Sequence, residues 1–212
     1  MMDIQSSLRR RNVVPARVTA AVLALAWAIS PAPASAQTFT FDPDHTEIRF
    51  SWDHLGLSRQ SGVLRKASGK LEYDPANPEA SRLEVIMRID DLTTGVPALD
   101  RLMKETPDIW NASAHPEITF RSTSVTMSGP TTANVGGDLT LNGQTLPAML
   151  SVSLNYAGAH PLAEVNPVYQ GVEVLGFSAR TQILRSQWGI TRSVPLVSDE
   201  IRISIETELL RQ

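Results

Sequence analysis

Apolar and polar residues alternate with a period of two through several segments of this chain. The clearest case begins at residue 45, where Ile48, Phe50 and Trp52 share one parity and polar residues occupy the positions between them. Such alternation is typical of a strand that buries one face and exposes the other. His54 continues the apolar parity. A titratable side chain is therefore predicted at the end of an inward-facing row.

The same pattern recurs along the chain and predicts about eight strands. Besides the first segment, alternating residues occupy 38–42, 62–73, 83–90, 118–127, 138–141, 144–156, 172–184 and 200–209. Gly69 interrupts one of these segments and predicts a bulge or bend. Short links between successive strands are typical of antiparallel sheets.

Proline and glycine residues predict where the strands turn. Pro43 is expected to end the first short strand, and Gly56 and Gly62 are expected to bracket a loop. Asn142-Gly143 lies between two alternating segments. This dipeptide favours a two-residue type I′ hairpin.

One segment, about residues 96–111, changes to a helical period. Leu99, Leu102 and Met103 have the i, i+3, i+4 spacing of an apolar helix stripe, and the apolar pattern continues to Trp110. This stripe must pack on another element, and a sheet surface or a barrel mouth is available. A short helical insertion over the sheet is therefore predicted.

The number and spacing of the strands indicate a sandwich or an up-and-down barrel. We favour the barrel. Eight strands enclose an interior that is either filled by side chains or holds one slim ligand. The prediction is thus an all-β, eight-stranded antiparallel barrel with one short helical insertion at about residues 96–111.

Residues 1–36 have the three-part pattern of a secretory signal. A basic start with four arginines precedes an apolar run over 18–30, and Ala34-Ser35-Ala36 forms a small-residue cleavage site. The apolar run is shorter than the ~20 residues that a membrane-spanning helix needs. We therefore expect cleavage before Gln37, a single mature domain of residues 37–212 in the periplasm, and no permanent membrane anchor. Arg10-Arg11 leaves general secretion and twin-arginine export both open.

Charge and cysteine content narrow the function classes. Cleavage removes four arginines and one aspartate from 19 Lys+Arg and 22 Asp+Glu, which leaves 15 and 21 and a net charge of −6. An acidic domain argues against nucleic acid or an anionic membrane surface as the main partner. The chain has no cysteine, which excludes disulfides, thiol catalysis and lipoprotein attachment.

Candidates for catalytic or metal chemistry are few. Asp53 beside His54 suggests an oriented base, and Asp42, Asp44, His45 and His54 offer carboxylate and imidazole ligands. Their spacing matches no known ligand pattern, and the chain has no phosphate-binding glycine motif or nucleophile elbow. We expect no catalytic residue, no metal and no cofactor. A metal-assisted or general-base hydrolase using His45, Asp53 and His54 is kept as the alternative.

Seven short motifs, taken in order, carry a family resemblance over residues 38–209. They are residues 41–50 (FDPDHTEIRF); His54-Leu55-Gly56 together with Gly62; Thr93 together with Gly95; Leu99-Asp100-Arg101; residues 115–120 (HPEITF); residues 137–143 (GDLTLNG); and Arg185 together with Trp188-Gly189. The sequence resembles the YceI family of exported lipid- or polyisoprenoid-binding proteins. The resemblance implies a lipocalin-like barrel that encloses a long amphiphile in an apolar cavity and has no catalytic chemistry.

The helical insertion departs from the family pattern. Family members often carry a His-Leu pair where this chain has Leu102-Met103, so no head-group role of that histidine is transferred. The more apolar pair suits a lid over a hydrocarbon chain, with ordinary core packing as the alternative. Near the C-terminus, Arg185 and Trp188 suggest a cation–π contact that latches one end of the barrel.

The function predicted from the sequence is an exported carrier of a polyisoprenoid, fatty acid or similar amphiphile, not an enzyme. His54 is expected at the polar end of the cavity. A stress-induced envelope protein with a filled barrel is a further alternative, and the oligomeric state, with a homodimer among the options, stays open. The predicted lining residues are Phe50, Trp52, His54, Leu83, Val85, Met87, Leu99, Leu102, Met103, Trp110 and Phe120.

Overall fold

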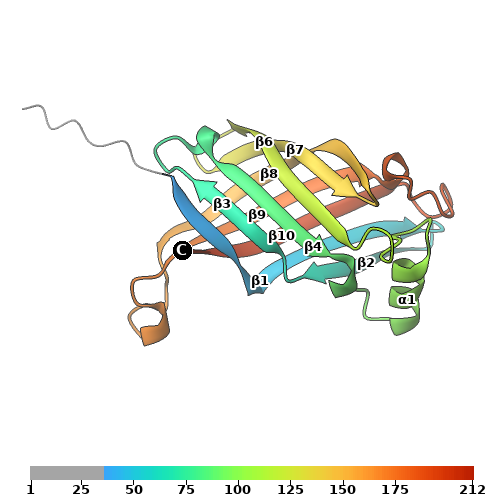
Figure 1. The fold of residues 1–212 in the computed structure, drawn as a ribbon, viewed down its shortest axis with the longest axis horizontal. Coiled ribbons are helices and arrows are strands. Elements are labelled where there is room, and N and C mark those ends of the chain that lie inside the picture. Colours follow the sequence, from blue (N-terminus) through green and yellow to red (C-terminus); the bar gives the residue numbers. More distant parts are fainter. Residues whose placement is uncertain (1–35) are drawn as a thin grey trace, which may run out of the picture. The chain divides into compact units, whose positions relative to one another are not determined.

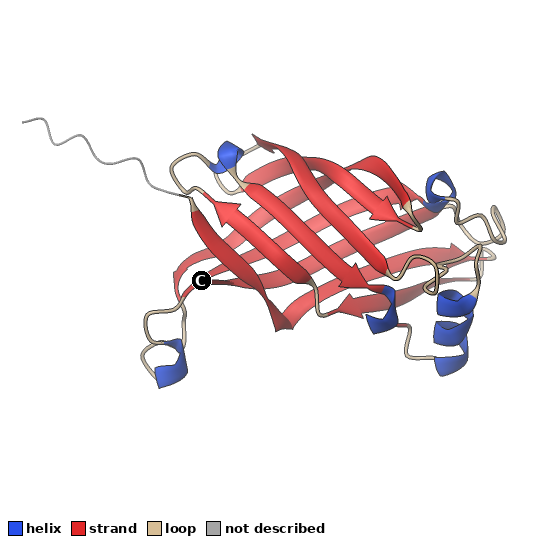
Figure 2. Ribbon diagram, in the orientation of Figure 1, coloured by secondary structure: helices blue, strands red, loops and turns tan. Residues whose placement is uncertain are grey.

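The computed structural model describes residues 36–212, so the predicted signal peptide, apart from its last residue, lies outside the described part. Strands form most of this part (Figure 2). The strands are β1 (Gln37–His54), β2 (Ser58–Arg65), β3 (Ser68–Tyr73), β4 (Arg82–Arg88), β5 (Leu92–Thr93), β6 (Glu117–Met127), β7 (Thr132–Leu141), β8 (Gln144–Ala159), β9 (Glu173–Leu184) and β10 (Glu200–Arg211). The helix is α1 (Pro97–Glu105), and the 3₁₀ turns are η1 (Pro78–Ala80), η2 (Ile89–Asp91), η3 (Pro167–Tyr169) and η4 (Arg185–Trp188).

The strands close into one antiparallel barrel (Figure 1). Pairing runs from β10 through β9, β8, β7, β6, β4 and β3 to β1, and β1 pairs again with β10. β2 and β3 share one position, because β2 pairs with the C-terminal half of β1 and β3 with its N-terminal end. The barrel therefore has eight strand positions, which confirms the predicted fold class.

β1 is one long strand, whereas the sequence predicted a break at Pro43. Both halves of β1 pair with β10, and the register shifts between Phe41 and Thr46. Residues 42–45 therefore bulge outward opposite the single residue Glu208. A bulge of this kind bends a strand without ending it, so the proline marks the bend and not a turn between two strands.

Two further turn predictions had different outcomes. Asn142 and Gly143 have φ values of 49° and 70° and join β7 to β8, which confirms the predicted type I′ hairpin. The loop predicted between Gly56 and Gly62 is shorter than expected, because β2 already begins at Ser58. Gly62 lies inside β2, where the ring of Phe50 occupies the space that a Cβ would need.

The helical insertion is also shorter than predicted. α1 ends at Glu105, and Thr106 has extended backbone angles of −84° and 122°. The following Pro107 disfavours a helical conformation at Thr106, so the rest of the insertion forms turns. One of these turns is held by the Trp110 amide, which donates to the Met103 carbonyl at 3.3 Å. Within residues 36–212, no helix combines the length and apolar character needed to cross a bilayer.

The two ends of the barrel carry different loops (Figure 1). The helix end carries α1, the β1–β2 turn (55–57) and the β9–β10 loop (185–199). The far end carries the β8–β9 loop (160–172) and the first residues of β1. Apolar residues of alternate parity fill or line the interior between these ends.

Candidate ligand-binding cavity

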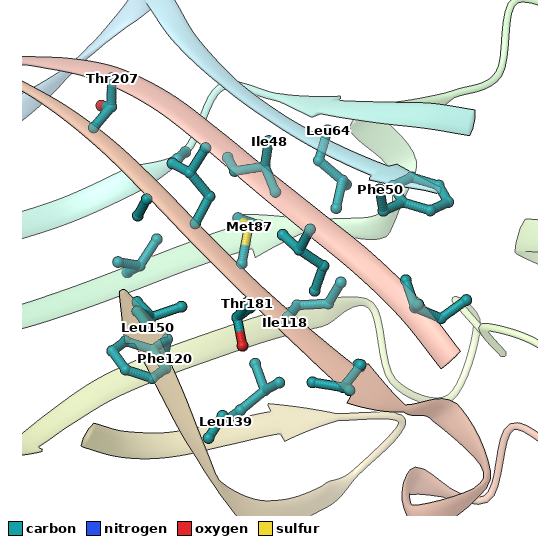
Figure 3. A pocket seen from close by; sticks show the side chains of 18 of the residues that line it. Ile48, Phe50, Leu64, Met87, Ile118, Phe120, Leu139, Leu150, Thr181 and Thr207 are labelled. Atoms are coloured by element: carbon teal, nitrogen blue, oxygen red, sulfur yellow. The ribbon is translucent and has the colours of Figure 1, made fainter. Parts of the chain in front are cut away.

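The barrel interior contains a cavity of about 640 Å³. Figure 3 shows side chains from opposite walls, including Ile48, Met87, Phe120 and Leu139, pointing into the same space. Each comes from the inward parity of its strand, since neighbouring residues in a strand point to opposite faces. The volume is within the ~300–1,000 Å³ range of small-molecule sites.

All eleven residues predicted from the sequence border this cavity. Their contact with a ligand remains a prediction. In chain order they are Phe50, Trp52 and His54 from β1, Leu83, Val85 and Met87 from β4, Leu99, Leu102 and Met103 from α1, Trp110 from the turn after α1, and Phe120 from β6.

Aromatic side chains form the cavity wall near the helix end. The rings of Phe50 and Trp52 are stacked with centroids 5.7 Å apart. Trp110 meets Phe50 edge-on at 5.6 Å. Such pairs contribute about 0.5–1.5 kcal/mol beyond their buried area. The insertion is therefore held against the barrel mouth by direct packing, and its apolar stripe lines the cavity.

The sequence prediction missed the cavity wall formed by the second half of the chain. The periodic signal was present in these strands, with Leu146 to Tyr156 and Ile201 to Ile205 on a constant parity. Parity alone does not distinguish lining residues from core residues. The missed lining residues include Val135, Leu139, Leu141, Ala148, Leu150, Val152, Leu154, Phe177, Ala179, Thr181, Ile183, Ile201, Ile203, Ile205 and Thr207.

Polar lining groups occur at both ends of the cavity, but those with charged or imidazole side chains lie toward the helix end. Toward the far end they are hydroxyls, such as that of Ser81. Deep in the barrel, the Thr46 and Thr207 hydroxyls lie 2.8 Å apart and satisfy each other. At the helix end, the cavity is bordered by His54, Gln60 and Arg192. An apolar slot whose charged and imidazole side chains lie at one end fits an amphiphile.

Arg185 ties the β9–β10 loop together beneath the helix end. Its guanidinium donates to four backbone carbonyls at 2.9–3.0 Å, those of Ile190, Arg192, Val197 and Ser198. Burial lowers the pKa of this side chain, while the nearby Asp199 opposes that shift. The predicted latch thus consists of hydrogen bonds. The expected cation–π contact with Trp188 is absent from the aromatic contacts of residues 36–212.

The alternative hydrolase residues do not come together. His45 lies in the bulge of β1, and His54 lies nine residues further along the same strand, about 30 Å away at ~3.3 Å per residue. Asp53 points to the opposite face from His54 and pairs with Arg59 and Arg202. His54 therefore has no carboxylate from Asp53 to orient it as a base.

A separate polar cluster joins the β1 bulge to β10. Ligand-type atoms of Asp42, His45 and Glu208 lie within 4.8 Å of one another. His45 Nδ1 is 2.9 Å from Asp42 Oδ2, and this hydrogen bond is the main cause of the raised pKa of His45. For Asp42, burial opposes the effect, but hydrogen bonds from His45 and the Asp44 amide outweigh it and lower the pKa. The Asp44 and His54 side chains, also considered as ligands, are not part of this cluster.

Comparisons with known proteins agree with this architecture. A family model described as a YceI-like domain matches residues 39–209. A UPF0312 protein from Ectopseudomonas mendocina is 31% identical over 194 residues, which cover 91% of this chain and 97% of that protein.

Solved structures show the same fold at lower identity. The Campylobacter jejuni YCEI protein has a TM-score of 0.65 at 24% identity, covering 76% of this chain and 90% of that chain. A domain from Saccharophagus degradans, described as polyisoprenoid binding, has a TM-score of 0.54 at 10% identity, covering 84% and 99%. At these identities the likeness concerns the fold alone. Because the family model spans most of the chain and the curated relative covers nearly all of it, the protein belongs to the YceI-like family.

Proposed function

We propose that this protein is an exported, periplasmic carrier that encloses the apolar chain of a polyisoprenoid, fatty acid or similar amphiphile inside its barrel. The observation that carries the proposal is the continuous apolar cavity of about 640 Å³. The description of the Saccharophagus degradans domain as polyisoprenoid binding supports the same ligand class. Export is inferred from the pattern of residues 1–36.

The cavity size sets the length of chain that fits. If each chain carbon takes roughly the ~30 Å³ that a water molecule occupies in the liquid, the cavity holds about twenty carbons. Burying each methylene contributes about 0.8 kcal/mol, so a filled cavity gains about 16 kcal/mol before the costs of association. Those costs are about 4–15 kcal/mol. Burial alone therefore supports useful affinity without strong polar contacts.

The charged and imidazole lining residues, which lie at the helix end, suggest the orientation of the ligand. We place the head group at the helix end, beside His54 and Arg192, and the chain toward the far end. Arg192 is 3.4 Å from Asp108 at the surface, so its guanidinium borders the cavity mouth while remaining solvated. A head group with hydrogen-bond acceptors fits this position.

A chain-length series tests the proposal. Natively purified protein is titrated with saturated fatty acids that displace a fluorescent fatty acid. Affinity should rise by up to about fourfold per methylene and level off near twenty carbons, when the cavity is full. His54→Gln, which replaces the imidazole with a neutral amide, should leave this slope unchanged. Absence of binding, or affinity that does not depend on chain length, would contradict the proposal.

The filled-barrel alternative predicts no displacement of the probe by any chain length. The hydrolase alternative has no supporting geometry, because His45 lies in the bulge in the middle of β1, nine residues from His54 at its end, and Asp53 faces away from the cavity. Release of fatty acid from an ester substrate by the wild type but not by a His54→Ala variant would revive it.

A further inference from the structure

Exposed apolar side chains gather around the helix end. Leu57 and Leu196 are 81% and 69% exposed, and Leu55, Val96 and Leu102 are about half exposed. They come from the β1–β2 turn, the β9–β10 loop and the start and middle of α1. Single exposed apolar residues are ordinary, but several on adjacent loops mark an interaction surface.

Two of these loops form one connected platform at the cavity mouth. The Leu55 amide donates to the Leu196 carbonyl at 3.0 Å, and His54 pairs with Val197 through an isolated bridge. Both His54 and Val197 also border the cavity, as does the half-exposed Leu102. The exposed leucines therefore lie beside the residues that line the entrance. We call Leu55, Leu57 and Leu196 the leucine platform.

The backbone at Leu55 is a second, independent observation. Leu55 and Gly56 have φ values of 57° and 70°, and the Leu57 amide donates to the His54 carbonyl at 2.9 Å. Positive φ at both central residues of such a turn favours Asn, Asp or Gly, and is costly for a leucine. Because the Leu55 side chain is 48% exposed, its packing does not offset that cost. Unfavourable backbone of this kind clusters at functional sites.

We propose that the leucine platform inserts into the surface of a lipid bilayer and brings the cavity mouth to the depth where acyl chains begin. This inference rests on the proposed carrier function. An apolar ligand chain that moves from the bilayer directly into the barrel never crosses water. The apolar surface beside the mouth allows this transfer by holding the mouth at the bilayer surface. Insertion of such residues reaches about 5–10 Å, the boundary between head groups and acyl chains.

The charges at this end predict which membranes are bound. Arg59 is 3.2 Å from Asp53, and Arg192 is 3.4 Å from Asp108. On α1, Arg101 and Lys104 are balanced in number by Asp100 and Glu105. Because the helix end carries both signs of charge, it has little net attraction for anionic head groups, and surface attraction would be screened by salt. Binding should therefore depend on apolar insertion, occur on uncharged phosphatidylcholine vesicles, and persist at high salt.

The far end provides a matched control surface. Leu162, Val165 and Val168 in the β8–β9 loop are 46%, 77% and 77% exposed. No residue of 160–172 borders the cavity. Substituting these three residues removes a similar amount of exposed apolar surface at a distance from the helix-end mouth.

Vesicle flotation with the natively purified protein tests the inference. We expect the wild type to float with phosphatidylcholine vesicles at low and high salt. The L55N/L57S/L196S variant should bind at least about tenfold more weakly, since three partly exposed leucines no longer insert. Its melting temperature should equal or exceed that of the wild type, because asparagine suits the positive φ at position 55. The L162S/V165S/V168S variant should float like the wild type.

Three results would overturn the inference. They are failure of the wild type to float, equal flotation of the leucine-platform variant, and loss of flotation only in the far-end variant. Displacement of the fluorescent fatty acid in vesicle-free solution separates these results from the carrier function. If that displacement persists while flotation fails, the carrier proposal stands and the membrane inference falls. If displacement itself fails, the carrier proposal falls.

Discussion

Ala179 offers a direct way to shorten the cavity without disturbing the barrel surface. It is buried near the middle of β9 and borders the cavity, with Val152 on β8 and Ile205 on β10 as its paired neighbours. Ala179→Leu adds three carbon atoms. At about 30 Å³ each, these remove roughly 90 Å³, close to one seventh of the cavity volume.

The two accounts of the interior make opposite predictions for this variant. In an empty slot, the leucine gains burial and displaces about three carbons of a ligand that fills the cavity. At about 0.8 kcal/mol per carbon, the loss is about 2.4 kcal/mol, or roughly fiftyfold in affinity. In a filled barrel, the same leucine overpacks the core and lowers the free energy of unfolding by about 1–3 kcal/mol.

The assay combines probe displacement with thermal unfolding. Affinity for a twenty-carbon fatty acid should fall about fiftyfold, affinity for a ten-carbon fatty acid should be nearly unchanged, and the melting temperature should not fall. Gln182→Leu, an exposed position on the same strand with the opposite parity, is the control and should change neither affinity. A destabilised Ala179→Leu variant that binds long chains as well as the wild type would refute the cavity interpretation.

Three further substitutions test other parts of the structure. Arg185→Ala leaves four buried or half-buried carbonyls without their donor and should cost about 3 kcal/mol in urea unfolding, with Arg185→Lys recovering only part of the loss. The hydrogen bond to Asp42 raises the pKa of His45, so the stability contributed by the protonated imidazole is complete below about pH 6.5 and is lost as pH rises through the folded-state pKa. The difference in free energy of unfolding between the wild type and His45→Gln should therefore shrink toward alkaline pH. A difference that grew with pH would contradict this. Gly69 has a φ of 126°, and Gly69→Ala places a Cβ against the Glu84 carbonyl of β4, so the substitution should lower the free energy of unfolding by about 2 kcal/mol or more. An unchanged midpoint of urea unfolding would contradict this, because it would mean that the strands move apart at no cost.

The strand pattern and the turn residues predicted an antiparallel all-β fold and narrowed it to a sandwich or a barrel, because each inward row obeys a period of two. The pairing of β1 with β10, which closes the barrel, decides between them. The β7–β8 hairpin was predicted correctly from the Asn142-Gly143 dipeptide alone, because these two residue types favour the positive φ values that the turn needs. Pro43 misled the prediction because a proline marks either a turn or a bulge, and only the pairing of both halves of β1 with β10 decides between them. Such long-range pairing is not encoded in any short segment.

The candidate cavity was predictable in part for the same reason. Phe50 and Met87 followed from parity, and the placement of Trp110 followed from the apolar stripe of the insertion. The wall formed by β7 to β10 was missed because an inward apolar residue can either pack or line a space. The four hydrogen bonds of Arg185 also required the loop geometry, since their acceptors are backbone carbonyls that any sequence provides.

The most direct test of the central claim is mass spectrometry of the lipid that accompanies the protein purified from the cells that produce it, with no lipid added and no detergent used. The carrier account predicts close to one equivalent of a long-chain amphiphile per barrel, with an apolar chain able to fill about 640 Å³. Protein that carries no lipid, and that takes none up when vesicles are supplied, would contradict the account.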